Sequence, residues 1–288
     1  MRTARNAKPM AFVMLVLLTF VLSSCTSLDG NEATNVVTYR FLGIGVGKYA
    51  QPGFADFGEA PPYQVVYSVL SKWKFNNGKI GFSSIIYISD LEATKKHILE
   101  SIQSALGSAD DNDVSYFYFG GHGGKNGDVY YLSPGDADSS IASQITVDEL
   151  AEAFQNIRGT KIVILDACYS GGFIEQSRAE ENPIHDAKAF HEAIKRAFGS
   201  GQYRILTSCG PSQISQTVNF EGYTIGAFTA ALLEGCGYRT FLADANSDRR
   251  VTLEEIHVYA EERIRSFGLE QDVMVYPPHA LSSSFAEY

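Results

Sequence analysis

Residues 114–124 read VSYFYFGGHGG, and residues 161–172 read KIVILDACYSGG. Each stretch begins as a strand, aromatic-rich in the first and continuously apolar in the second. Each then ends in small residues around one reactive side chain, His122 in the first stretch and Cys168 in the second. Because functional groups of open parallel sheets gather at the carboxyl ends of the strands, we expect His122 and Cys168 at the same edge of one sheet.

Strand and helix patterns alternate along the chain. Strands are expected at Val36–Val46, Ser84–Ile88, Val114–Phe119, Lys161–Leu165 and Tyr203–Thr207. Helices are expected around the fourfold spacing of Ile98, Ile102 and Leu106, from the Thr146–Glu149 capping box to about Gln155, over Ala227–Leu233 and over Leu253–Ile264. This alternation requires crossover connections, so it predicts an α/β fold with a mainly parallel sheet and helices on both faces.

The composition is that of an ordinary globular protein. Of 288 residues, 45% are hydrophobic and 19% are charged, so a core of normal size needs no disulfide or metal for folding. The formal net charge of −10 argues against nucleic-acid partners, because phosphate binding needs concentrated lysine and arginine. Neither a His-Glu-x-x-His motif nor paired Cys-x-x-Cys motifs are present, which argues against zinc.

The first residues are typical of an export signal. A basic start at Arg2, Arg5 and Lys8 precedes the apolar run Met10–Leu22, which is too short for a confident membrane span. The run ends in Leu22-Ser23-Ser24-Cys25, which resembles the bacterial lipobox. The resemblance implies a signal peptide over residues 1–24, a lipidated Cys25 that anchors the protein to a membrane, and a tether over residues 25–35.

The residue after the lipobox indicates the membrane to which the lipoprotein would be delivered. Thr26 follows Cys25 where an aspartate would retain a lipoprotein in the inner membrane, so the resemblance implies outer-membrane delivery, on the periplasmic or surface face, in a Gram-negative cell. A plain signal peptide with a chance cysteine is the alternative. Three further cysteines remain, and Cys209 and Cys236 could form a disulfide or be two buried thiols.

The two reactive motifs resemble those of a known family. Gly-His-Gly around His122 and Asp-Ala-Cys-Tyr-Ser-Gly around Cys168 resemble the caspase and metacaspase group of cysteine peptidases, most closely its bacterial members. The histidine lies 46 positions upstream of the cysteine, and about 50 is typical of caspases. Further similar segments are Arg40–Lys48, Leu132–Asp138 and Gly226–Gly235. The resemblance implies a caspase-like three-layer sandwich over residues 36–270, followed by a C-terminal tail over residues 271–288.

The resemblance also implies roles for the residues around the motifs. His122 would be the general base and Cys168 the nucleophile, because a neighbouring imidazole supports the thiolate that attacks a carbonyl. The backbone N–H groups of Gly123 and Cys168 would form the oxyanion hole. No cofactor is required for this chemistry, and the substrate would be a peptide or protein.

Asp166 is the residue expected to set the preference for the P1 side chain of the substrate. It lies two residues before Cys168 on the same side of the strand, and its place resembles the floor of the metacaspase P1 pocket, which suits Arg or Lys. A carboxylate that only orients loop amides is the alternative. The group's early acidic residue has no clear counterpart between Gln51 and Tyr67, where Asp56 and Glu59 are candidates. A legumain-like asparaginyl preference therefore stays open.

Two further segments bear on regulation. The charged stretch Glu175–Gly199 offers basic sites for self-cleavage, at Arg178, Lys188, Lys195 and Arg196. A later loop has the ligand spacing of an EF-hand, with oxygen donors at Asp244, Asn246, Asp248, Thr252 and Glu255. Arg249 replaces the usual glycine of that loop, and a capping box explains Thr252 and Glu255 without a metal. Calcium therefore remains an open alternative.

These observations predict a lipid-anchored cysteine endopeptidase that cleaves after Arg or Lys. One rival is a catalytically silent protein that uses the same fold for binding. An α/β-hydrolase is a second rival, but Asp166 and Ala167 replace the Gly-x that precedes the nucleophile in its strained turn. The sequence indicates no oligomeric state.

Overall fold

The computed structural model describes residues 36–52, 54, 56, 63–171, 173, 202–277 and 280–288, all within the unit Val36–Tyr288. The expected signal peptide, Cys25, the tether, Glu59 and the stretch Glu175–Gly199 lie outside the described residues. Within the described ranges, no helix is both long enough and apolar enough to cross a membrane.

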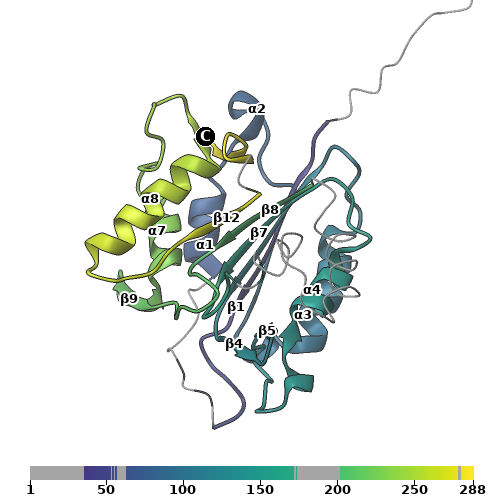
Figure 1. Ribbon diagram of the computed structural model, residues 1–288. Coiled ribbons are helices and arrows are strands. Elements are labelled where there is room, and N and C mark those ends of the chain that lie inside the picture. Colours follow the sequence, from purple (N-terminus) through teal and green to yellow (C-terminus); the bar gives the residue numbers. More distant parts are fainter. Residues whose placement is uncertain are drawn as a thin grey trace, which may run out of the picture. The chain divides into compact units, whose positions relative to one another are not determined.

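A six-stranded sheet forms the centre of this unit (Figure 1). In spatial order its strands are β12 (Met274–Tyr276), β8 (Tyr203–Thr207), β7 (Thr160–Asp166), β3 (Val114–Gly120), β1 (Tyr39–Gly45) and β2 (Ser84–Ser89). All neighbouring pairs are parallel except β12 and β8, which are antiparallel. The expected mainly parallel sheet is therefore confirmed.

Three smaller sheets complete the strands of the described residues. They are β4 (Gly123–Asn126), β5 (Val129–Leu132) and β6 (Ile145–Thr146); β9 (Thr217–Phe220) and β10 (Tyr223–Gly226); and β11 (Arg250–Thr252) with β13 (Ser284–Glu287). The expected domain boundary at residue 270 does not match the end of the packed structure. Strand β12 joins the central sheet after that residue, and β13 pairs with β11.

Helices cover both faces of the central sheet (Figure 1). They are α1 (Tyr63–Leu70), α2 (Phe75–Gly78), α3 (Lys95–Leu106), α4 (Val147–Phe154), α7 (Ala227–Gly235) and α8 (Leu253–Ser266). Single 3-10 turns occur at η1 (Asp90–Glu92) and η2 (Ile141–Ser143). One core lies under α3 and α4, and a second lies under α7 and α8. The three-layer arrangement predicted from the sequence is thus present.

The local signals explain most helix positions. Ile98, Ile102 and Leu106 are fully buried on one face of α3, as their spacing predicts. The capping boxes of α4 and α8 form as expected, with both hydrogen bonds present in each. Strand β2, which includes the expected strand Ser84–Ile88, is the edge of the sheet, and its Ile86 is 39% exposed.

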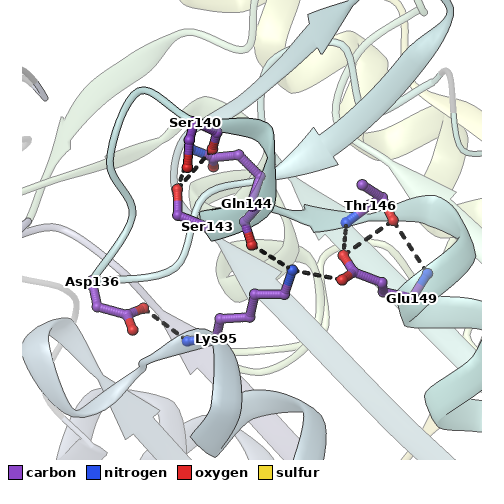
Figure 2. Close-up of polar contacts among 8 residues, drawn as sticks. Lys95, Asp136, Ser140, Ser143, Gln144, Thr146 and Glu149 are labelled. Carbon is purple, nitrogen blue, oxygen red and sulfur yellow. Dashed lines mark hydrogen bonds and ion pairs between the residues drawn. The ribbon is translucent and has the colours of Figure 1, made fainter.

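A polar network holds the loop that follows His122 (Figure 2). Asp136 Oδ1 accepts a hydrogen bond from the Lys95 backbone N–H at 2.8 Å. The Lys95 ammonium donates to Glu149 Oε1 at 2.6 Å and to the Ala142 carbonyl at 2.9 Å. These contacts tie the start of α3, the loop and the start of α4 together, so the β4–β6 sheet is fixed beside His122.

Candidate active site

The register of β3 and β7 brings His122 and Cys168 together. Gly120 and Asp166 are the last paired residues of the two parallel strands, and neighbouring strands lie about 4.8 Å apart. His122 and Cys168 each follow two residues later. A Cβ added to Gly123 would lie 2.5 Å from the Cys168 carbonyl oxygen, so the two segments touch and only glycine fits there. Both reactive side chains belong to half-exposed residues.

Tyr49 positions the histidine. The His122 backbone N–H donates to Tyr49 Oη at 2.6 Å, and the two ring centroids are 4.9 Å apart. The turn before Tyr49 is held by Asp90 Oδ1, which accepts hydrogen bonds from the backbone N–H groups of Gly47 and Lys48. Neither Tyr49 nor Asp90 was predicted from the sequence, because their contacts join segments far apart in the chain.

The surroundings of Cys168 favour the neutral thiol. Burial is the main cause that raises the pKa of Cys168 above its ordinary value. Its Sγ lies 3.8 Å from the Ser215 carbonyl oxygen. The next residue, Tyr169, has a φ of 59°, a left-handed conformation that is uncommon outside glycine, and its N–H donates to the Gln213 carbonyl at 2.9 Å. Strained backbone of this kind clusters at functional sites.

Asp166 is buried and fully engaged by hydroxyl and amide donors. It is 5% exposed. Its Oδ1 accepts from Ser215 Oγ at 2.7 Å, and its Oδ2 accepts from Thr229 Oγ1 at 2.5 Å and from the Thr229 backbone N–H at 3.0 Å. Burial raises the pKa of Asp166, and these hydrogen bonds offset only part of that rise.

The start of α7 explains why the carboxylate lies there. Gly226 occupies the N-cap position and has no side chain to accept from the first turn. Asp166 Oδ2 takes that role, and a Cβ on Gly226 would lie 1.9 Å from the same oxygen. A helix whose N-cap residue has no side chain needs a hydrogen-bond acceptor from another segment for the N–H groups of its first turn. The glycine at the start of α7 is therefore a sequence signal that could have pointed to Asp166.

A cavity of about 60 Å³ joins Cys168 to this carboxylate. Its lining includes Cys168, Asp166, Ser215 and the threonines Thr217 and Thr224. The glycine turn after β1 and the residues Gly120 and Gly121 form another wall, whereas His122, which follows Gly121 in the chain, is not part of the lining. Cys168 and Asp166 are thus brought into one pocket, with the histidine next to it.

The expected early acidic residue is not in this pocket. Asp56 Oδ1 accepts from the Tyr49 backbone N–H at 3.1 Å, and Asp56 does not line the cavity. Among the described lining residues, the acidic side chain is Asp166.

The segment after residue 270 holds the loop that carries Ser215. Gln271 is buried; its Nε2 donates to the Ser208 carbonyl at 2.6 Å and its Oε1 accepts from the Gln216 N–H at 2.8 Å. Asp272 accepts from Gln213 Nε2 at 2.8 Å. The segment after residue 270, which was expected to be a tail, therefore supports the loop of the candidate site.

Cys209 Sγ lies 3.3 Å from the carbonyl oxygen of Ala167, the residue before Cys168, whereas Cys236 and the EF-hand-like loop do not line the cavity. Cys209 and Cys236 are buried free thiols, which resolves the alternative against a disulfide. In the loop, Asp244 Oδ1 accepts from the Asp248 N–H, and Glu255 caps α8. Arg249 has a φ of 70°, the left-handed conformation that usually favours glycine. Within the described part of the chain, no group of three or more His, Cys, Asp or Glu side chains is arranged to hold a metal ion.

Comparisons with known proteins agree with this architecture. A protein of Geobacter sulfurreducens with a solved crystal structure is 15% identical, with a TM-score of 0.54 over 85% of this chain and 97% of that one. Caspase-1 from Spodoptera frugiperda is also 15% identical, with a TM-score of 0.48 over 83% of this chain and 86% of that one. The comparison with curated protein sequences gives no match.

A family model described as the caspase domain matches residues 67–272, which is more than half of the chain. The match spans β3 and β7, the segments with His122 and Cys168 that follow them, and α7 and α8. The chain therefore belongs to the caspase-domain family, whose members are generally cysteine peptidases, and it has the caspase-like fold.

Proposed function

We propose that this protein is a cysteine endopeptidase in which His122 is the general base and Cys168 the nucleophile. The observation that carries the proposal is the register of β3 and β7, which pairs Gly120 with Asp166 two residues before the reactive side chains. Membership of the caspase-domain family supports the same chemistry.

The raised pKa of Cys168 defines the first step. Burial raises the pKa of the Cys168 thiol and so favours its neutral form. In the proposed first step, His122 removes the thiol proton as the sulfur attacks the scissile carbonyl carbon. The C–N bond then breaks, and the imidazolium returns the proton to the leaving amine. Water, deprotonated by the same imidazole, then attacks the thioester carbonyl carbon. The C–S bond breaks, the imidazolium returns the proton to Cys168 Sγ, and the carboxyl product leaves. The backbone N–H groups of Gly123 and Cys168 would stabilise the oxyanion of each tetrahedral intermediate.

Asp166 is the proposed anchor of the P1 side chain. It lines the same cavity as Cys168, and no cationic side chain of the described residues makes an ion pair or hydrogen bond with it. An Arg or Lys side chain would supply the missing counter-charge through charge-assisted hydrogen bonds. The hydroxyl groups of Ser215 and Thr229 hold the carboxylate ready for that contact.

The dyad is tested by substitution. We expect Cys168→Ala and His122→Ala each to lower kcat/KM on the order of 10⁴-fold, and the double variant to add little, because the two groups act as one unit. Cys236→Ala is the matched control, since Cys236 is a buried residue at the end of α7 that does not line the pocket of Cys168. Iodoacetamide should label Cys168 before Cys209 or Cys236. Full activity of Cys168→Ala would mean that another group is the nucleophile, and no peptide cleavage by the wild type would mean that the fold is catalytically silent.

We also propose that Cys25 is lipidated and that the protein is anchored to a membrane through it. The lipobox-like sequence before Cys25 supports this. Cys25→Ala should move the protein out of the membrane fraction or leave its precursor uncleaved, while Cys209→Ala should change neither. Unchanged membrane partition of Cys25→Ala would contradict the anchor.

A further inference from the structure

A second cavity lies behind the candidate active site, between α1, the sheet and α7. Its volume is about 70 Å³, and its walls are almost entirely apolar, with Val69, Trp73 and Leu233 among them. A single water needs only about 10–15 Å³. The cavity therefore has room for a molecule of several heavy atoms.

Gly43 makes room for the rings of Tyr87 and Phe41 at the wall of this cavity. In the register of the sheet, Gly43 of β1 lies opposite Tyr87 of β2 on one side and Tyr118 of β3 on the other. A Cβ on Gly43 would lie 2.8 Å from Tyr87 Cδ2, so a larger residue would displace that ring. Both tyrosines line the cavity.

The hydroxyl of Tyr87 is buried and has no hydrogen-bond partner among the described residues. A buried hydroxyl that makes no hydrogen bond is destabilising, so native proteins rarely leave one in that state. A bound molecule with one hydrogen-bond acceptor would satisfy this group while its apolar part covers the other walls.

The other tyrosine connects the cavity to Asp166. Tyr118 Oη lies 2.7 Å from Thr229 Oγ1, and Thr229 Oγ1 donates to Asp166 Oδ2. Because the threonine proton is used in that bond, Tyr118 is the donor to Thr229. Tyr118 and Thr229 both line the apolar cavity, and Tyr118 also lines the pocket of Cys168. A molecule that moves either side chain would change how the carboxylate is held.

We propose that this cavity binds a small, largely apolar molecule that accepts one hydrogen bond from Tyr87, and that its occupancy changes the binding of substrate at Asp166. The effect on substrate binding rests on the proposed function. The binding of the small molecule does not, because it can be measured without catalysis.

Trp73 is the chain's single tryptophan and it lines the cavity, so its fluorescence reports occupancy. The probes are 2,2,2-trichloroethanol and chloroform, which both quench tryptophan and differ by one hydroxymethyl group. For the full chain we expect saturable quenching by both, with trichloroethanol binding about three- to tenfold more tightly. Tyr87→Phe should remove that preference and keep the binding.

The control variant is Val66→Phe, which fills the cavity from α1 without touching the pocket of Cys168. It should abolish saturable quenching by both probes. Quenching that rises linearly with concentration, or that is the same in Val66→Phe, would overturn the site. An unchanged preference in Tyr87→Phe would overturn the role of its hydroxyl.

Coupling is measured on the same proteins with peptide substrates. At saturating trichloroethanol, KM for Arg or Lys substrates should change about fivefold in the wild type and stay constant in Val66→Phe. Saturable binding with an unchanged KM would overturn the coupling. A protein that cleaves no peptide, with or without the probe, would contradict the proposed function, and the fluorescence result would still decide the site.

Discussion

Asp113 and Asp166 are buried carboxylates at opposite ends of the central sheet. Asp113 precedes β3 and accepts a hydrogen bond from Arg40 Nη1 at 2.7 Å. Asp166 ends β7 and accepts hydrogen bonds from Ser215 and Thr229. Burial acts to raise the pKa of both. At Asp113 the hydrogen bonds from the Asp110 N–H and from Arg40 outweigh burial and lower the pKa, whereas at Asp166 the pKa stays raised.

The difference separates a carboxylate that is paired with a cation inside the fold from one that lines a cavity without such a partner among the described residues. Arg40 balances Asp113 within the fold. Asp166 has no such cation among the described residues, and it lines the cavity of Cys168. An uncompensated buried charge is costly, so it persists where a function or a substrate supplies the partner. The comparison predicts that substitutions at the two ends of the sheet have different consequences.

The largest effect is expected from Asp166→Asn. This substitution keeps the shape of the pocket but removes the charge that binds a P1 cation. We expect kcat/KM for Arg and Lys substrates to fall about 100-fold or more, because one partner of a buried charge pair is lost. For substrates with a neutral P1 residue, kcat/KM should change less than about tenfold. Equal losses for both substrate classes would mean that Asp166 serves only as the cap of α7.

The next effect concerns stability at the other end of the sheet. Arg40→Met leaves Asp113 buried without its cation, and we expect the free energy of unfolding to fall by about 3–5 kcal/mol. Lys96→Met is the matched control, because Lys96 is 82% exposed in its pair with Glu100 and should change stability by less than about 0.5 kcal/mol. Denaturant unfolding measures both. If Arg40→Met lowers the free energy of unfolding only slightly, Asp113 does not depend on its cation, and the proposed contrast with Asp166 is wrong.

The two carboxylates also predict opposite dependences of stability on pH. The folded pKa of Asp113 is lowered, so its contribution is present above the unfolded pKa of about 3.9 and is lost as pH falls through the folded value. The folded pKa of Asp166 is raised, so the folded state binds the extra proton and stability falls as pH rises from about 3.9 through the folded value. Relative to the wild type, Asp166→Asn should therefore gain stability across that window. A parallel pH profile would contradict the raised pKa.

The smallest effect is expected at Lys161, at the start of the strand that Asp166 ends. Its ammonium is buried and donates to the Ile157 carbonyl at 2.9 Å and to Gln202 Oε1 at 3.0 Å. Burial lowers the pKa of Lys161 to about 8. Since the unfolded value is about 10.4, stability should rise with pH between about 8 and 10.4, and Lys161→Met should lose that rise without changing P1 preference. Altered P1 preference in Lys161→Met would show that any buried charge in β7 affects the pocket.

The patterns that predicted this architecture are local. The aromatic and apolar runs of β3 and β7, the spacing of Ile98 with Ile102 and the capping boxes each depend on neighbouring residues, and each formed as predicted. Asp166 was singled out as a pocket residue by its place two positions before Cys168. The lining of the cavity agrees with that placement.

The missed residues depend on contacts between distant segments. Tyr49 meets the His122 backbone across 73 positions, Thr229 meets Asp166 across 63, and Gln271 meets Ser208 across 63. No periodicity or motif within one segment records such pairs. The expected tail was misjudged for the same reason, because its strands are short and their partners lie elsewhere in the chain.

A P1 scan tests the central claim most directly. A peptide library varied at P1 is cleaved by the wild type and by Asp166→Asn, with Cys168→Ala as the blank. The account predicts that the wild type cleaves after Arg and Lys, that Asp166→Asn loses this preference, and that the blank cleaves nothing. A clear wild-type preference for Asp, Asn or an apolar residue at P1 would contradict it.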